Sequence, residues 1–186
     1  MGVCFFMIEV EVKAHITDFK EIKDKLSSLG AREVKREFQM DIYFNAPHRD
    51  FIQTDEALRI RRITSKDGDE IILTYKGAKL DELSKTREEI EVTIEDMENT
   101  KLILEKLGFK PVQPVKKDRV YYNINEYIIT LDTVHGVGNF MEIEKGLNEE
   151  ADYQESLDEI FSLYGKLGVT DGFERRSYLE LLELSS

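Results

Sequence analysis

Charged side chains recur at every second position through most of the chain's segments rich in β-branched and aromatic residues. Successive side chains of a β-strand point to opposite faces, so this period places the charges on one face of a sheet. They are Glu9, Glu11 and Lys13; Arg59 and Arg61; Lys76; Arg87, Glu89 and Glu91; Lys117 and Arg119; Asp132; Glu142 and Glu144. The pattern predicts an antiparallel sheet with one charged face and one apolar face.

The charged face has two readings. Any one of these strands is typical of a half-exposed sheet whose polar face meets water. Across all the strands, however, a solvated face would normally mix in Ser, Thr, Asn and Gln. Closing the sheet would turn the charges inward and remove its edges, and the buried charges would then have to pair or hold a ligand. We therefore predict an α+β fold in which the sheet forms a closed antiparallel β-barrel with flanking α-helices.

Helices are expected between the strands. Apolar residues recur at helical spacing over residues 19–29, 97–107 and 153–167, and a glycine follows each segment. Residues 177–184 are expected to form a short docked helix. Asp67-Gly68, between two strand-like segments, indicates a hairpin, and residues 77–85 read as a mobile polar loop.

Two parts of the chain resemble each other at an offset of 78 residues. The offset aligns Asp18 with Asp96 at the two helix starts and Gly30 with Gly108 at the two helix ends. It also aligns Asp41 with Arg119, so that the charged faces coincide while the charges differ in sign. We infer a strand–helix–strand unit used twice, in a pseudo-twofold barrel whose halves present unlike charges to one interior.

Length and composition limit the classes of function. The 186 residues suit one domain, 1–186, in which residues 1–6 are expected to be an N-terminal extension. Asp and Glu (38) outnumber Lys and Arg (26), which argues against nucleic-acid binding. No segment reaches the roughly 20 apolar residues of a membrane helix. The single Cys4 excludes an internal disulfide and suits a reducing, cytoplasmic location. A homodimer is left open.

The mixture of charges on the predicted inner face suits a metal–triphosphate ligand. Carboxylate oxygens bind hard divalent cations, and the arginine fork binds phosphate through two parallel hydrogen bonds. No glycine-rich phosphate loop of the GxxxxGK[ST] or GxGxxG type is present. Metal and cationic side chains would have to supply the phosphate binding.

Several motifs in order resemble the CYTH superfamily. Residues 9–13 (EVEVK) match its ExExK signature, and the further matches are FQMDIYF at 38–44, ALRIR at 57–61, LTYKG at 73–77 and GVGNFMEIE at 136–144. These segments look most like the class IV adenylate cyclase branch. The resemblance implies an eight-stranded tunnel, a triphosphate substrate such as ATP or tripolyphosphate, and Mg²⁺ or Mn²⁺ as the metal.

The resemblance also implies roles for individual residues. The candidate metal ligands are Glu9, Glu11, Asp132, Glu142 and Glu144. The candidate phosphate clamp is Lys13, Arg59, Arg61, Lys76, Arg87, Lys117 and Arg119. Glu89 and Glu91 are expected to orient these cations rather than to bind a second metal.

Three functions are compatible with such a site. A cyclase would convert ATP to cyclic AMP and pyrophosphate, whereas a triphosphatase would hydrolyse tripolyphosphate or thiamine triphosphate with the same clamp. The cyclase is favoured because the matching segments outside the common core belong to that branch, and because the chain has no Trp to stack on a thiamine ring. The third possibility is a sensor that binds nucleotide or polyphosphate without turnover. It is disfavoured because all the expected carboxylates are present.

Overall fold

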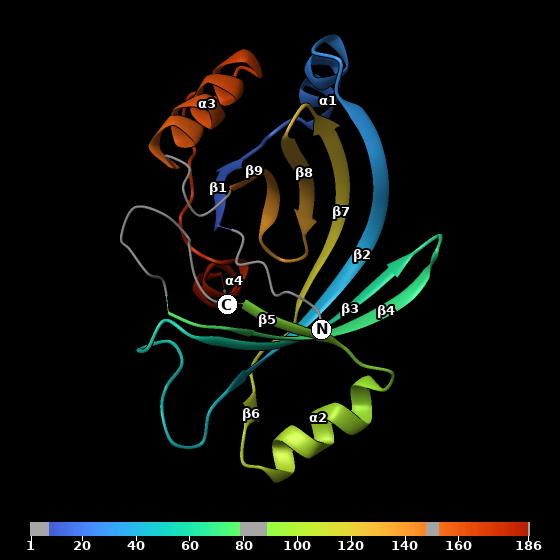
Figure 1. Ribbon diagram of the computed structural model, residues 1–186, viewed down its shortest axis with the longest axis vertical. Helices are drawn as coiled ribbons and strands as arrows, with labels where there is room; N and C mark the ends of the chain where they lie inside the picture. Colours follow the sequence, from blue (N-terminus) through green and yellow to red (C-terminus); the bar gives the residue numbers. More distant parts are fainter. Residues whose placement is uncertain (1–7, 79–88, 148–152, 186) are drawn as a thin grey trace.

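The computed structural model describes residues 8–78, 89–147 and 153–185 (Figure 1). In chain order the elements are β1 (Ile8–His15), α1 (Phe19–Ser28), β2 (Arg32–Asn45), β3 (Ala57–Ser65), β4 (Gly68–Lys76), β5 (Glu89–Thr93), α2 (Met97–Lys106), β6 (Lys110–Pro111), β7 (Val115–Ile124), β8 (Tyr127–Val134), β9 (Gly138–Leu147), α3 (Tyr153–Lys166) and α4 (Tyr178–Leu184). The predicted extension 1–6, Arg87 and most of the predicted loop 77–85 lie outside the described residues.

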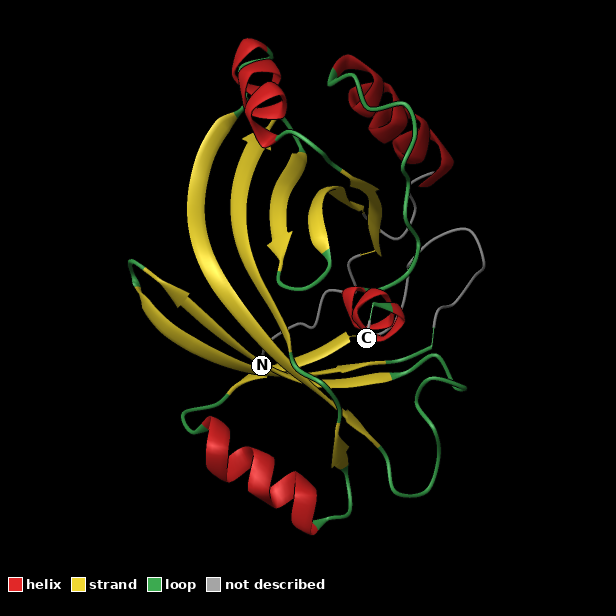
Figure 2. Ribbon diagram, turned by 180° about the vertical axis from the view of Figure 1, so that it is seen from behind, coloured by secondary structure: helices red, strands yellow, loops and turns green. Residues whose placement is uncertain are grey.

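All the strands belong to one antiparallel sheet in the order β1-β9-β8-β7-β2-β3-β4-β5, with the short β6 pairing with β2. The long strands curve strongly (Figures 1 and 2). Among the described strands, however, no pairing joins β1 to β5, so the sheet is open and the predicted closed barrel is not confirmed. Over the described residues the two edges of the sheet are therefore β1 and β5.

Three helices cover the apolar outer face of the sheet. Leu26 of α1 and Ile160 of α3 pack with Val12 of β1 and Ile143 of β9 in the largest buried cluster. At the opposite end of the molecule, α2 packs on β2, β3 and β4, where Met97 and Ile60 are buried (Figure 1). The predicted alternation is therefore confirmed, with apolar side chains turned toward the helices.

The fourth helix lies on the other side of the sheet. Here the inner face is the face that carries Lys13, Arg59, Lys117 and Arg119. Near one end of β7, β8 and β9 this face is apolar, and Val115, Val134 and Phe140 form a buried cluster with Tyr178, Leu181 and Leu182 of α4. Helix α4 thus covers an apolar layer that lies directly beside the charged residues.

The repeated strand–helix–strand unit is visible in matching helix caps. Asp18 accepts hydrogen bonds from backbone N–H groups at the start of α1, as Asp96 does at the start of α2. The glycines that follow the two helix caps, Gly30 and Gly108, have φ angles of 81° and 93°. Because this left-handed conformation is easy only for glycine, both helix ends were readable from the sequence. Gly68 begins β4 at the predicted hairpin, with φ 123°.

None of the described helices is long and apolar enough to cross a membrane.

Truncating Ile143 tests the assignment of inner and outer faces. Ile143 is 0% exposed among the residues that α1 and α3 cover, so Ile143→Ala should lower the free energy of unfolding by about 2–5 kcal/mol. The control Ile103→Ala removes an exposed side chain of α2 and should change it by about 0.5 kcal/mol or less. Urea unfolding measures both changes. Equal, small losses would mean that β9 presents the opposite face to the helices.

Candidate active site

Strand register places acids and bases opposite each other on the inner face. Five cross-strand pairs combine one cation with one carboxylate: Lys13 with Glu142, Glu37 with Arg119, Asp41 with Arg61, Lys76 with Glu89, and Arg119 with Asp132. Directly opposite side chains in an antiparallel pair lie close enough to interact. Many of the charges of this face are therefore held by neighbours from adjacent strands.

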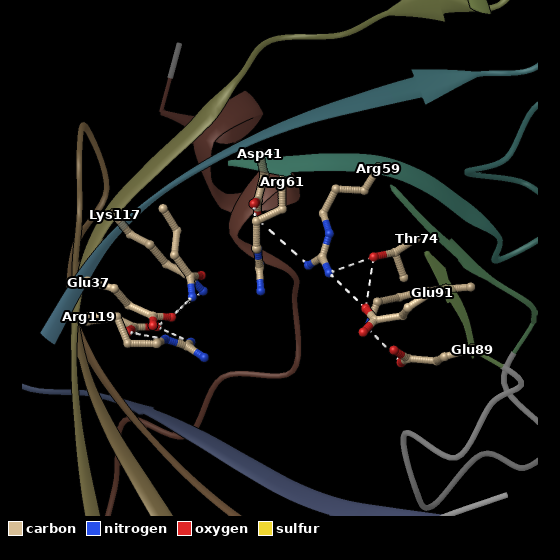
Figure 3. Close-up of polar contacts among 12 residues, drawn as sticks. Glu37, Asp41, Arg59, Arg61, Thr74, Glu89, Glu91, Lys117 and Arg119 are labelled. Carbon is tan, nitrogen blue, oxygen red and sulfur yellow. Dashed lines mark hydrogen bonds and ion pairs between the residues drawn. The ribbon is translucent and has the colours of Figure 1, made fainter. Parts of the chain in front are cut away.

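Asp41 is the anion around which two of the arginines gather. Its oxygens accept hydrogen bonds from Arg61 Nε at 2.6 Å and Arg61 Nη2 at 2.7 Å, and Arg59 Nη1 lies 3.8 Å away. Although burial opposes ionisation, the two guanidinium groups hold the pKa of Asp41 well below its usual range. In Figure 3, Asp41 and Arg61 lie between two further clusters, one around Arg119 and one around Glu91.

Arg119 is the centre of a second cluster. It donates from Nε to Asp132 Oδ1 at 2.6 Å, and from Nη2 to both Asp132 and Glu142. The two carboxylates raise the pKa of Arg119 in spite of its burial. Tyr178 also donates to Asp132, at 2.8 Å. Asp132 is 0% exposed, and in this arrangement its oxygens bind Arg119 and Tyr178; its predicted role as a metal ligand stays a prediction.

Lys117 is a buried cation with weak compensation. Its Nζ lies 3.6 Å from Asp132 Oδ2, and the residue is 3% exposed. Burial, followed by repulsion from Arg119, lowers the pKa of Lys117 to about 8. A bound anion would favour the charged lysine at this position, which is the electrostatic condition for a phosphate site.

The third cluster lies on β4 and β5. Lys76 donates to Glu89 at 2.6 Å, and Thr74 donates to Glu91 at 2.8 Å. Arg59 Nη2 bonds to Thr74 at 3.2 Å and lies 3.7 Å from Glu91 (Figure 3). Glu89 and Glu91 thus contact the cations that they were expected to orient.

Next to Arg119, a hydrogen-bond network centred on Glu37 joins β2 to β7. Glu37 accepts hydrogen bonds from Gln39 Nε2 at 2.5 Å and from the Tyr121 hydroxyl at 2.8 Å, and Lys35 lies 2.9 Å away. Burial, with the carboxylate of Glu37 beside it, raises the pKa of Tyr121 to about 12. Figure 3 shows Glu37 beside Lys117 and Arg119.

The candidate metal ligands lie on neighbouring strands. Glu11 of β1 is the register partner of Glu144 of β9, and Glu142 shares the face of Glu144 two residues away. Three carboxylates on one face are the oxygen donors that Mg²⁺ and Mn²⁺ prefer, so the donor chemistry fits. Among the described side chains, no three acidic, histidine or cysteine residues stand close enough together to hold an ion. The side chain of Glu9 lies outside that set.

The structure thus brings most of the predicted site residues onto one face. It also adds residues that the sequence analysis left out of the site, above all Asp41, Thr74 and Tyr178. Asp41 carries a signal that could have been used, because it shares the strand phase of Gln39 and aligns with Arg119 in the repeat. Tyr178 carries none, because it reaches the site from a separate helix.

Comparisons with known proteins point to one protein family. The CYTH domain matches residues 7–178. A protein of Methanocaldococcus jannaschii named "Putative adenylate cyclase MJ0240" is 46% identical, over 94% of this chain and 98% of its own length. "Adenylate cyclase CyaB" of Aeromonas hydrophila is 27% identical, over 95% of this chain and 90% of its own length.

Among solved structures, the PH1819 protein of Pyrococcus horikoshii OT3 is 44% identical and superposes with a TM-score of 0.87, over 96% of this chain and 99% of that one. The curved antiparallel sheet is therefore shared with an experimentally determined relative. The match to the domain over nearly the whole chain, together with these relatives, shows that the chain belongs to the CYTH family.

Proposed function

We propose that this protein is a metal-dependent adenylate cyclase that converts ATP to cyclic AMP and pyrophosphate. The observation that carries the proposal is the set of four buried cations on one face, Lys13, Arg59, Lys117 and Arg119, which are 3% to 8% exposed. So many buried positive charges are costly unless carboxylates and an anionic ligand offset them. The name of the Methanocaldococcus jannaschii relative, 46% identical, favours the cyclase among the reactions that such a clamp can support.

Each group would have a distinct task in this reaction. The ribose 3′-hydroxyl attacks the α-phosphorus, the bond from that phosphorus to the bridging oxygen breaks, pyrophosphate leaves, and the hydroxyl proton is released. Lys117 and Arg119 would neutralise charge that gathers on the leaving group. Asp41 and Asp132 hold Arg61 and Arg119 in orientation. A Mg²⁺ or Mn²⁺ ion at Glu11, Glu142 and Glu144 would supply acidification of the attacking hydroxyl.

Product analysis separates this reaction from its alternatives. The protein is incubated with ATP, and separately with tripolyphosphate, each with Mg²⁺ or Mn²⁺ and with EDTA controls. We expect cyclic AMP and pyrophosphate in equal amounts from ATP, lost with EDTA. Phosphate release without cyclic AMP would reject the cyclase in favour of a triphosphatase. Metal-dependent binding with no turnover of either compound would instead support a sensor.

Replacing Glu142 tests the proposed metal ligands. We expect Glu142→Ala to lower metal-dependent turnover by about 100-fold and to raise the metal concentration needed for half-maximal rate. The fold should persist because Arg119 keeps its hydrogen bonds to Asp132. The matched control is Glu126→Ala, which removes a carboxylate that is 76% exposed. Full turnover of Glu142→Ala at saturating metal would remove Glu142 from the metal ligands.

A further inference from the structure

Tyr178 reaches from the C-terminal helix α4 into the charged part of the inner face. Its hydroxyl donates a hydrogen bond to Asp132 Oδ2 at 2.8 Å, and its ring centroid lies 5.0 Å from that of Phe140. The residue is 8% exposed. Tyr178 therefore joins the apolar layer under α4 to the carboxylate that holds Arg119.

The ring of Tyr178 contacts two candidate phosphate-binding cations. Lys13 Nζ lies 4.2 Å from the ring centroid, and Lys117 Nζ lies 5.0 Å from it. These lysines belong to β1 and β7, which β9 and β8 separate in the sheet. The negative face of an aromatic ring attracts cations, so one side chain influences where both ammonium groups stand.

The chain that leads into α4 is fastened to β1 beside the same lysine. The backbone N–H of Glu174 donates to Lys13 O at 2.8 Å, and Lys13 Nζ donates to the carbonyl oxygen of Arg176. Ser177 is the N-cap of α4 and forms a capping box with Glu180. These contacts tie the segment before Tyr178 to Lys13 of β1.

We propose that Tyr178 is a positioning residue that holds Lys13 and Lys117 at the spacing that binds one polyphosphate chain. Like charges held near each other in a buried site repel, and the ring offsets that repulsion. The hydroxyl adds a second effect, because it fixes Asp132, which in turn orients Arg119. The proposal rests on the proposed function, since it concerns how the cations of that site grip the phosphates of its substrate.

A residue that only packs would behave differently. Leu181 belongs to the same apolar cluster under α4, and it is the matched control for lost packing. Removing a purely packing side chain lowers the melting temperature but leaves the affinity and kinetics of the folded protein unchanged. Removing Tyr178 should change the affinity and the kinetics as well as the melting temperature.

The test compares full-length Tyr178→Leu, Tyr178→Phe and Leu181→Ala with the unaltered protein. Calorimetry in EDTA gives the Kd for tripolyphosphate, and steady-state assays with ATP and Mg²⁺ give kcat and KM. We expect Tyr178→Leu, which lacks the ring, to raise the Kd about tenfold. Tyr178→Phe keeps the ring, so its Kd should stay within about twofold while kcat falls about tenfold through Asp132 and Arg119. Leu181→Ala should lower only the melting temperature.

Each outcome supports or rejects the positioning role. An unaltered Kd in folded Tyr178→Leu would reject it, as would an equal rise in Kd in Leu181→Ala. If Tyr178→Leu does not fold, kcat of Tyr178→Phe decides, and an unchanged kcat rejects the role. If the unaltered protein neither binds tripolyphosphate nor turns over ATP, the proposed function fails, and the positioning role fails with it. If only the variants lose affinity or turnover, the proposed function is still supported.

Discussion

Asp132→Ala should lower the free energy of unfolding by about 3–5 kcal/mol, because it leaves buried cations without their carboxylate. Asp132 is fully buried and accepts hydrogen bonds from Arg119 and Tyr178, with Lys117 Nζ at 3.6 Å. Without Asp132, Arg119 loses hydrogen bonds to two carboxylate oxygens, and the hydroxyl of Tyr178 loses its acceptor. Urea unfolding at neutral pH measures the loss.

The control for this change lies on the next strand. Asp118 is the register neighbour of Thr133 and pairs with His135 at 2.7 Å, but its side chain is 62% exposed. Asp118→Ala should therefore cost about 1 kcal/mol or less. A loss in Asp132→Ala no larger than in Asp118→Ala would show that Arg119 finds other partners, and the account of the second cluster would then be wrong.

Lys117→Met should stabilise the fold while it removes activity. The substitution keeps much of the side-chain volume and removes a buried cation whose pKa is lowered to about 8 from its usual 10.5. That lowering corresponds to about 3 kcal/mol of destabilisation at neutral pH, which the methionine relieves. Turnover should fall by about 10²- to 10³-fold, because a charge that stabilises the leaving group is lost.

The pH dependence of stability provides an independent check on Lys117. Because the folded protein releases this proton near pH 8 and the unfolded chain near 10.5, the unfolded state binds more protons between these values. The contribution of Lys117 to stability should therefore rise as the pH increases through this window, and Lys117→Met should lack that rise. The exposed neighbour Lys116 gives the control variant Lys116→Met. A clear loss of stability in Lys117→Met would mean that the ammonium is well compensated.

The local parts of the fold could be predicted from the sequence. Helix ends at Gly30 and Gly108 follow from backbone sterics, and the period of two on β9 follows from strand geometry, so both depend only on near neighbours in the chain. The inward phase of Arg59, Lys117 and Arg119 was predicted on the same basis. These features need no knowledge of which strands pair.

Long-range features could not be predicted in the same way. Whether β1 meets β5 depends on the length and curvature of all the strands, which no local pattern encodes. The pairing of Asp41 with Arg61 requires the β2–β3 register, although the strand phase of Asp41 was visible. Tyr178 required knowledge of where α4 docks, 46 residues beyond Asp132.

Among the described strands β5 is an edge of the sheet, and this position bears on aggregation. Exposed edge strands can pair with other chains and cause aggregation, and charged side chains on an edge strand oppose this. Glu89 and Glu91 alternate on β5 with Ile90 and Val92, which are 57% and 52% exposed. Glu89 and Glu91, which contact the cations, thus also oppose aggregation through this edge strand. Variants that replace Glu89 and Glu91 with neutral residues are expected to aggregate more readily, in addition to any effect on phosphate binding.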